Sequence, residues 1–191
     1  MSRTRLEAFS DGVIAILITI MVLQLTPQRG HDLAALRSLV PVFLSYVLSF
    51  LYLGIYWTNH HHLFQVVEQV DGRVLWANTH LLFWLSLVPF LTAWLGNNGL
   101  AALPLALYGL VLLASAIAYY FLTRALLALH RPDSALATAL KGNRKEKVSI
   151  ALYAAGIVLA FVNVWLSCAA YVIVALIWLI PDRRVERVLA Q

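Results

Sequence analysis

The sequence is poor in cysteine and in charge. Its 191 residues include one cysteine, Cys168, and only 12% are charged. A single cysteine excludes an intramolecular disulfide and any metal or redox site of the CxxC type. The low charge, together with 62% apolar residues and a mean hydropathy of +0.81, excludes an ordinary soluble domain, in which about 45–50% of residues are apolar. The composition therefore predicts an integral membrane protein.

Signatures of catalysis are also missing. The chain has no GxSxG, no phosphate loop, no Gly-rich nucleotide turn and no selectivity filter of the Thr-Val-Gly-Tyr-Gly type. His60, His61 and His62 are adjacent and diverge around a helix, so one chain cannot hold a metal with all three. We therefore expect no enzyme, no cofactor and no bound metal. The net charge of +5 comes from basic residues that flank apolar runs, which argues against a nucleic-acid partner.

Apolar runs predict six membrane spans in one all-α domain. Crossing a bilayer core of about 30 Å takes about 20 helical residues. The spans are expected at about residues 6–25, 39–57, 74–95, 100–123, 148–162 and 164–181. The last two come from an uncharged run too long for one helix, which we expect to turn near Asn163. Pro89 predicts a kink in the third span. Residues 130–147 are expected to form a basic cytosolic loop near anionic lipid.

The distribution of basic residues predicts the orientation. With six spans and a cytosolic N-terminus, twelve basic residues lie inside: Arg3, Arg5, Arg73, Arg124, Arg131, Lys141, Arg144, Lys145, Lys147, Arg183, Arg184 and Arg187. Only Arg29 and Arg37 lie outside. Such an excess is typical of cytosolic loops, so we expect both termini in the cytosol. Because Ser10 and Asp11 interrupt the first apolar run, we expect a membrane helix there and not a secretory signal.

The first span joins a charged start to an apolar run. In a helix of 3.6 residues per turn, Ile16, Thr19, Ile20 and Leu23 share one face, while Ser10 and Asp11 point away from it. An apolar stripe of this kind is typical of helix packing. The spacing alone therefore does not indicate a pore.

Asp11 needs polar partners, because an acid inside a membrane helix costs about 2.5–3.5 kcal/mol on insertion scales. Asn59 and His60 end the second span and Asn78 and His80 begin the third, all near the depth of Asp11. We therefore expect a buried polar network that fixes the packing of the first three helices. A proton relay through the same residues is the alternative.

Two motifs resemble those of a known family. The first is Arg5-x-x-x-Phe9-Ser10-Asp11-Gly12-Val13-x-Ala15-Ile16-x-x-Thr19, and the second is Trp57-x-Asn59-His60-His61-x-x-Phe64. They resemble the motifs of the first and second helices in the transmembrane protein 175 family of potassium channels. One six-helix repeat per chain is similar to the prokaryotic members. The resemblance implies a homotetramer in which the first helices surround a central pore, and it assigns Ile16, Thr19, Ile20 and Leu23 to the pore lining.

These observations together predict a potassium-permeable cation channel of a prokaryotic inner membrane. Four copies of Ile16 are expected to form an apolar constriction that closes by dewetting. Arg5, Phe9, Ser10, Asp11, Asn59, His60 and His80 are expected to form the signature and packing network. The expected partners are other copies of the chain, the lipid bilayer, and potassium or other monovalent cations. A proton-coupled secondary transporter using Asp11 with His60 or His80, and a non-conducting membrane scaffold, remain as alternatives.

Overall fold

Helices make up all the regular structure in the part of the chain that the structure describes. This structure is a computed structural model, and it describes residues 2–26, 32–140 and 144–179. The helices are α1 (Arg3–Val22), α2 (Leu33–Ser38), α3 (Val40–Gln65), α4 (Gly72–Ser86), α5 (Val88–Asn97), α6 (Ala102–Leu129), α7 (Ala135–Leu140), α8 (Arg144–Leu159) and α9 (Val164–Leu179). The predicted all-α class is thus confirmed for the described residues.

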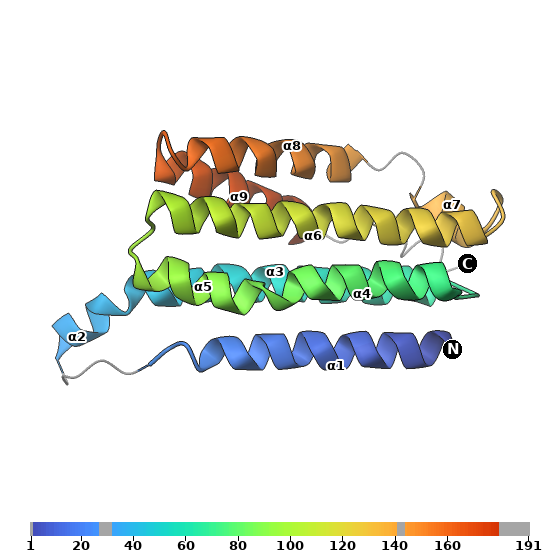
Figure 1. Cartoon of the computed structure of the whole chain (residues 1–191), viewed down its shortest axis with the longest axis horizontal. Coiled ribbons are helices and arrows are strands. Elements are labelled where there is room, and N and C mark those ends of the chain that lie inside the picture. Colours follow the sequence, from blue (N-terminus) through green and yellow to red (C-terminus); the bar gives the residue numbers. More distant parts are fainter. Residues whose placement is uncertain (1, 27–31, 141–143, 180–191) are drawn as a thin grey trace.

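The long helices run side by side in an elongated bundle (Figure 1). α1 contacts α3, α4 and α5, and α6 contacts α4, α5, α8 and α9. The α8–α9 hairpin and α1 therefore flank the bundle on opposite sides of the α3–α6 centre, as Figure 1 shows. The starts of α1 and α4 lie at the same end of the bundle as the ends of α3 and α6. Among the residues that the structure describes, this arrangement leaves one side of α1 without a neighbour.

Local sequence explains where the helices begin. The Ser2 hydroxyl accepts a hydrogen bond from the backbone of Arg5, and the Asp71 carboxylate accepts one from Val74 at 2.9 Å. Both are N-caps that satisfy an otherwise unpaired backbone donor. Asn163 plays the corresponding part in front of α9, where its side-chain oxygen accepts from the backbone N–H of Trp165 at 2.9 Å. The predicted turn near Asn163 is therefore present.

The helix bounds differ from the predicted spans at several places. α3 continues to Gln65 and α6 to Leu129, past the predicted ends at residues 57 and 123. α7 and the start of α8 occupy part of the predicted loop 130–147. The third span is interrupted at Leu87, and α5 restarts with Pro89 in its first turn, where the missing backbone donor is tolerated. Lys141, residues 180–181 of the last span, Arg183, Arg184 and Arg187 lie outside the described residues.

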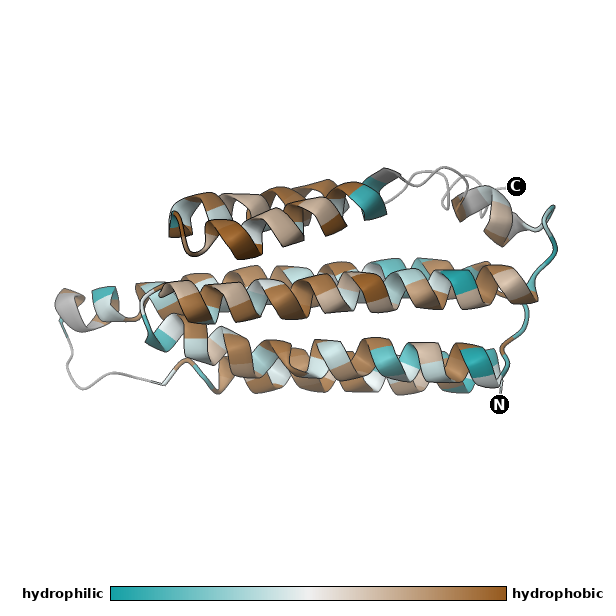
Figure 2. Cartoon of the chain, turned by 45° about the horizontal axis from the view of Figure 1, so that its top comes forward, coloured by the Kyte–Doolittle hydropathy of each residue, from teal (hydrophilic) through white to brown (hydrophobic). Residues whose placement is uncertain are grey.

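Three helical segments of the described chain are long and apolar enough to cross a membrane. They are Val40–Gln65, Gly72–Asn97 (α4 with α5) and Ala102–Leu129, and α9 is a shorter apolar helix. α1 is less apolar because its first half carries charged residues, and α8 also begins with charged residues. Hydrophilic residues gather towards the end of the bundle where α1 begins, as Figure 2 shows. This pattern is typical of a helical membrane protein with one polar rim.

Candidate pore helix and its anchoring network

One face of α1 is packed into the bundle. Leu6, Ser10, Ile14, Leu17 and Met21 are buried, and they recur at intervals of three or four residues. That spacing places them on one stripe of a helix, so α1 lies against α3, α4 and α5 through a single continuous face.

The opposite face of α1 is mostly apolar, and no part of the described chain covers it. Ile16 is 57% exposed, Ile20 is 40% exposed and Leu23 is 72% exposed. Thr19 is exposed on the same face, and its hydroxyl donates to the Ile16 carbonyl at 2.9 Å. Next to them Gly12 has open space where a side chain would stand. The four residues that the resemblance assigns to a pore therefore share an unpartnered stripe.

A chain of buried hydrogen bonds joins the packed face of α1 to α4 and α3. The Asn78 side-chain amide donates to the Ser10 hydroxyl at 2.9 Å, and the Ser10 hydroxyl donates to the Leu6 carbonyl at 2.9 Å. His60 Nε2 lies 2.8 Å from the Asn78 carbonyl oxygen and so donates to it. Ser10, His60 and Asn78 are all fully or almost fully buried. The network thus joins one side chain from each of α1, α3 and α4.

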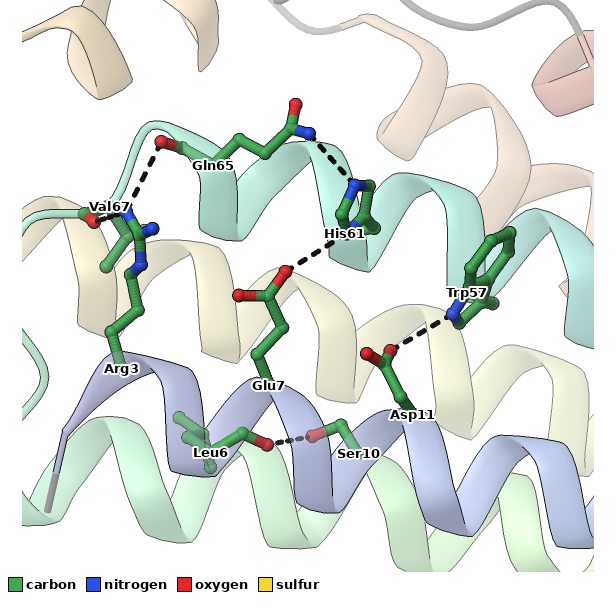
Figure 3. A network of polar contacts seen from close by, with 9 residues as sticks. All are labelled: Arg3, Leu6, Glu7, Ser10, Asp11, Trp57, His61, Gln65 and Val67. Carbon is green, nitrogen blue, oxygen red and sulfur yellow. Dashed lines mark hydrogen bonds and ion pairs between the residues drawn. The ribbon is translucent and has the colours of Figure 1, made fainter.

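A second set of polar contacts joins α1 to α3 near the bundle end (Figure 3). The Trp57 indole N–H donates to the Asp11 carboxylate at 3.0 Å. His61 Nδ1 lies 3.0 Å from a Glu7 carboxylate oxygen. The Arg3 guanidinium donates to the Val67 carbonyl at 2.9 Å, where α3 has ended. Together these contacts fix both the height and the rotation of α1 against α3.

The remaining predicted residues lie elsewhere. The Asn59 amide donates to the Ile55 carbonyl in its own helix at 2.8 Å. His80 is exposed, and its Nε2 accepts from the Trp84 indole one turn further along α4. Arg5 and Phe9 are also exposed, on the uncovered side of α1. The structure therefore brings Ser10 and His60 together through Asn78, pairs Asp11 with Trp57, and does not place His80 beside either.

Sequence reasoning did not single out Glu7, His61 and Arg3 as contacts between α1 and α3. The available signal was their spacing, because Arg3, Glu7 and Asp11 follow each other at intervals of four residues, as do Trp57, His61 and Gln65. Ionisable residues of membrane helices commonly pair with polar groups inside the bundle, so two such stripes on neighbouring helices are expected to pair. No group of three metal-binding side chains occurs among the described residues.

Comparison with known proteins decides the family. The model of the family described as "Endosomal/lysosomal potassium channel TMEM175" matches residues 5–89. A protein of Chryseobacterium sp. (strain P1-3) named potassium channel is 50% identical over 191 residues, which is 100% of both chains. The chain belongs to the TMEM175 family. A second relative, a protein of Chamaesiphon minutus also named potassium channel, is 32% identical to this chain. The match covers 90% of this chain and 91% of that one.

A solved structure of a TMEM175 member has the same fold. The crystal structure of a "lysosomal potassium-selective channel TMEM175 homolog" from Chamaesiphon minutus matches with a TM-score of 0.81 and 30% identity. The match covers 94% of this chain and 97% of that one. The TMEM175 family is one of ion channels and not of enzymes. With its three apolar segments, this member is a membrane protein.

Proposed function

We propose that this chain is a potassium-permeable cation channel in which the first helices of four subunits line one central pore. The observation that carries the proposal is the uncovered face of α1, with Ile16 57% exposed on a helix whose other face packs against α3, α4 and α5. Other helices of the chain also expose apolar side chains, which lipid covers in a membrane protein. What distinguishes this face of α1 is that it carries Ile16, Thr19, Ile20 and Leu23, the positions that the family resemblance assigns to the pore lining. Potassium as the permeant ion is supported by the names of the two bacterial relatives and by the potassium-selective channel whose crystal structure matches.

A fourfold arrangement suits the position of α1 in the bundle. α1 lies at one side, held by α3, α4 and α5, and its free stripe runs from Gly12 to Leu23. Because cyclic symmetry places the same stripe of each copy around one axis, four copies enclose a path lined by identical side chains. The rings then follow in the order Ile16, Thr19, Ile20 and Leu23 from the polar rim outwards.

We propose in addition that the chain crosses the bilayer six times. α1, α3, the α4–α5 pair, α6, α8 and α9 each run along the bundle (Figure 1). Spans at about residues 6–25, 39–57, 74–95, 100–123, 148–162 and 164–181, with the basic stretch 130–147 inside, place the polar rim in the cytosol. We place both termini there as well, in the inner membrane of a prokaryotic cell.

The polar contacts of α1 serve as struts in this proposal. Asp11 is bonded to Trp57, and Ser10 is bonded to Asn78, on the sides of α1 that face its own chain. Neither is directed at the Ile16 stripe. The network therefore holds the start of α1 in place while the apolar part of the helix forms the pore.

The gate is tested by replacing Ile16 with asparagine. Four apolar side chains at one level exclude water from a narrow path, and polar side chains at that level would wet it. We expect I16N channels in planar bilayers to carry at least severalfold more current than the parent. Ile18 points away from the stripe, towards α3, so I18N is the matched control and should not increase the current. An I16N current no larger than that of the parent would overturn the gate assignment.

The permeant ion is tested by the reversal potential under opposed potassium and sodium gradients. We expect stepwise single-channel currents whose reversal potential is shifted from zero towards the equilibrium potential of potassium. Saturable flux driven by a proton gradient, without single-channel steps, would indicate the secondary transporter. Liposomes that show no ion flux with tetrameric protein would indicate a scaffold.

A further inference from the structure

A short loop, residues 66–71, joins α3 to α4 at the polar rim, at the end of the bundle where α1 begins and α6 ends (Figure 1). Val67 in this loop is fully buried, whereas Glu68 and Gln69 are exposed. Two side chains from helices far apart in the sequence bind its backbone. They are Arg3 of α1 and His130, which follows the last residue of α6.

Arg3 binds carbonyl groups of this segment and His130 binds N–H groups of it. The Arg3 guanidinium donates to the Val67 carbonyl at 2.9 Å and to the Gln65 carbonyl at 3.5 Å (Figure 3). His130 Nε2 lies 3.1 Å from the backbone nitrogen of Glu68 and 3.4 Å from that of Gln69. The 66–71 loop therefore connects the start of α1 to the end of α6.

The partners of the His130 ring fix its protonation state. Its Nδ1 lies 2.8 Å from the Leu126 carbonyl oxygen, which can only accept, so Nδ1 carries a proton. Its Nε2 faces two backbone N–H groups, which can only donate, so Nε2 carries none. The arrangement thus requires a neutral imidazole. A second proton, on Nε2, would point at two donors and remove the contact with the loop.

Several charged side chains belong to the segments around His130. They are Glu68 and Asp71 in the loop, Arg73 in α4, and Arg131 and Asp133 beyond α6. Asp71 caps α4, and Arg131 pairs with Asp133 at 3.4 Å, while Glu68 and Arg73 are exposed. His61 is a histidine of the same rim that binds α1, and its protonation would strengthen its contact with Glu7. Acidification therefore acts on His61 and on His130 in opposite directions.

We propose that His130 is a pH-sensitive switch that controls the 66–71 loop. Neutral His130 holds the loop against the end of α6, and protonated His130 releases it. Because Arg3 is bonded to the same loop, release also loosens the start of α1. Histidine changes its charge between about pH 5 and 8, so the switch responds to acidification at this rim. This proposal does not rest on ion conduction by the chain.

Hydrogen exchange of the full chain in lipid nanodiscs tests the switch at about pH 8 and about pH 5. Each exchange rate is divided by that of the unfolded chain at the same pH. We expect the normalised exchange in residues 66–71 to be about tenfold faster at the acid pH, because two N–H groups lose their acceptor. The first turn of α1 should also exchange faster, through Arg3.

Equal normalised exchange of the loop at the two pH values would overturn the proposal. Faster exchange in the loop with no change at the start of α1 would overturn the link through Arg3. The measurement needs no current, so failure of the channel proposal would be seen separately.

Two variants of His130 and one control assign the response. A glutamine gains no proton in this range, so in His130→Gln the exchange of residues 66–71 should be the same at both pH values. His130→Lys replaces the acceptor with a cationic donor and should give fast exchange at both. His80→Gln is the matched control, because His80 is exposed and bonds within α4, and it should respond as the parent does. A full response in H130Q would place the switch on a carboxylate such as Glu68 or Asp71 and would overturn the assignment.

Discussion

Asn78 is the residue through which α4 holds α1 and α3 together. Its amide nitrogen donates to Ser10 and its carbonyl oxygen accepts from His60, all in a fully buried setting. A buried polar group that loses its partner costs more than the bond itself contributes, because the partner stays dehydrated. Asn78 therefore matters more to the fold than its single side chain suggests.

We expect Asn78→Ala to lower the stability of the folded chain by about 1–3 kcal/mol, since it leaves Ser10 and His60 without their shared partner. The measurement is thermal unfolding of purified protein in one fixed detergent. Thr79→Ala is the matched control, because Thr79 is exposed and bonds only to Leu75 in its own helix. If both variants unfold at the same temperature as the parent, the buried hydrogen bonds of Asn78 do not stabilise the fold.

Asp11→Ala tests whether this acid is a strut. The change removes the acceptor of the Trp57 indole at 3.0 Å and with it one of the contacts that fix the rotation of α1. We expect a smaller tetramer fraction in light scattering, with the ion preference of the remaining channels unchanged. Intact tetramers with altered selectivity would instead place Asp11 in the ion path.

At the scale of elements, α6 and α8 are held together by Tyr171 of α9. A methyl group added at Gly109 would overlap the Tyr171 hydroxyl, and one added at Gly156 would overlap its ring. The two glycines therefore form the slot in which the ring lies. Overpacking of such a slot costs about 1–3 kcal/mol.

We expect Gly109→Ala and Gly156→Ala each to lower the unfolding temperature of the purified protein, because a methyl group at either glycine would overlap a ring carbon of Tyr171. Tyr171→Phe should rescue neither variant, since phenylalanine keeps those ring carbons. Gly54→Ala is the control, since Gly54 lies in α3 with open space at the same position. Unchanged unfolding temperatures in both G109A and G156A, or harm from Gly54→Ala, would contradict this slot.

Much of the element pattern was predictable because apolar runs and their Pro, Gly and Asn boundaries are local signals. The end of α3 was not, since its last turns carry polar residues that are equally typical of a loop. The helix persists there because His60, His61 and Gln65 find partners on α1 and α4 or within the helix itself. The position of each residue along its predicted span indicated that His60 and Asn78 lie near the depth of Ser10, and the three side chains are hydrogen-bonded. The pairing of Asp11 with Trp57 depends on helix rotation, which no spacing along one helix gives.

The two sides of the bundle differ in whether the described chain covers them. α1 presents an uncovered stripe on one side, and the α8–α9 hairpin closes the bundle on the other. The core between them, α3 to α6, contains the three segments long enough to cross a membrane. We infer that this core keeps the membrane position, against which α1 forms the pore, and that α8 and α9 complete six crossings.

Labelling of single cysteines tests the six crossings and their direction. In a Cys168→Ala background, Asn98→Cys and Val162→Cys are exposed at the turns after α5 and α8, so an impermeant maleimide should label both on intact spheroplasts. Asp133→Cys, exposed in the stretch before α7, should react only after permeabilisation. If residues 148–181 formed one span, V162C would lie in the bilayer and stay unlabelled while N98C reacted. Labelling of D133C on intact spheroplasts would show the opposite orientation, in which the basic residues near Asp133 face the outside of the cell.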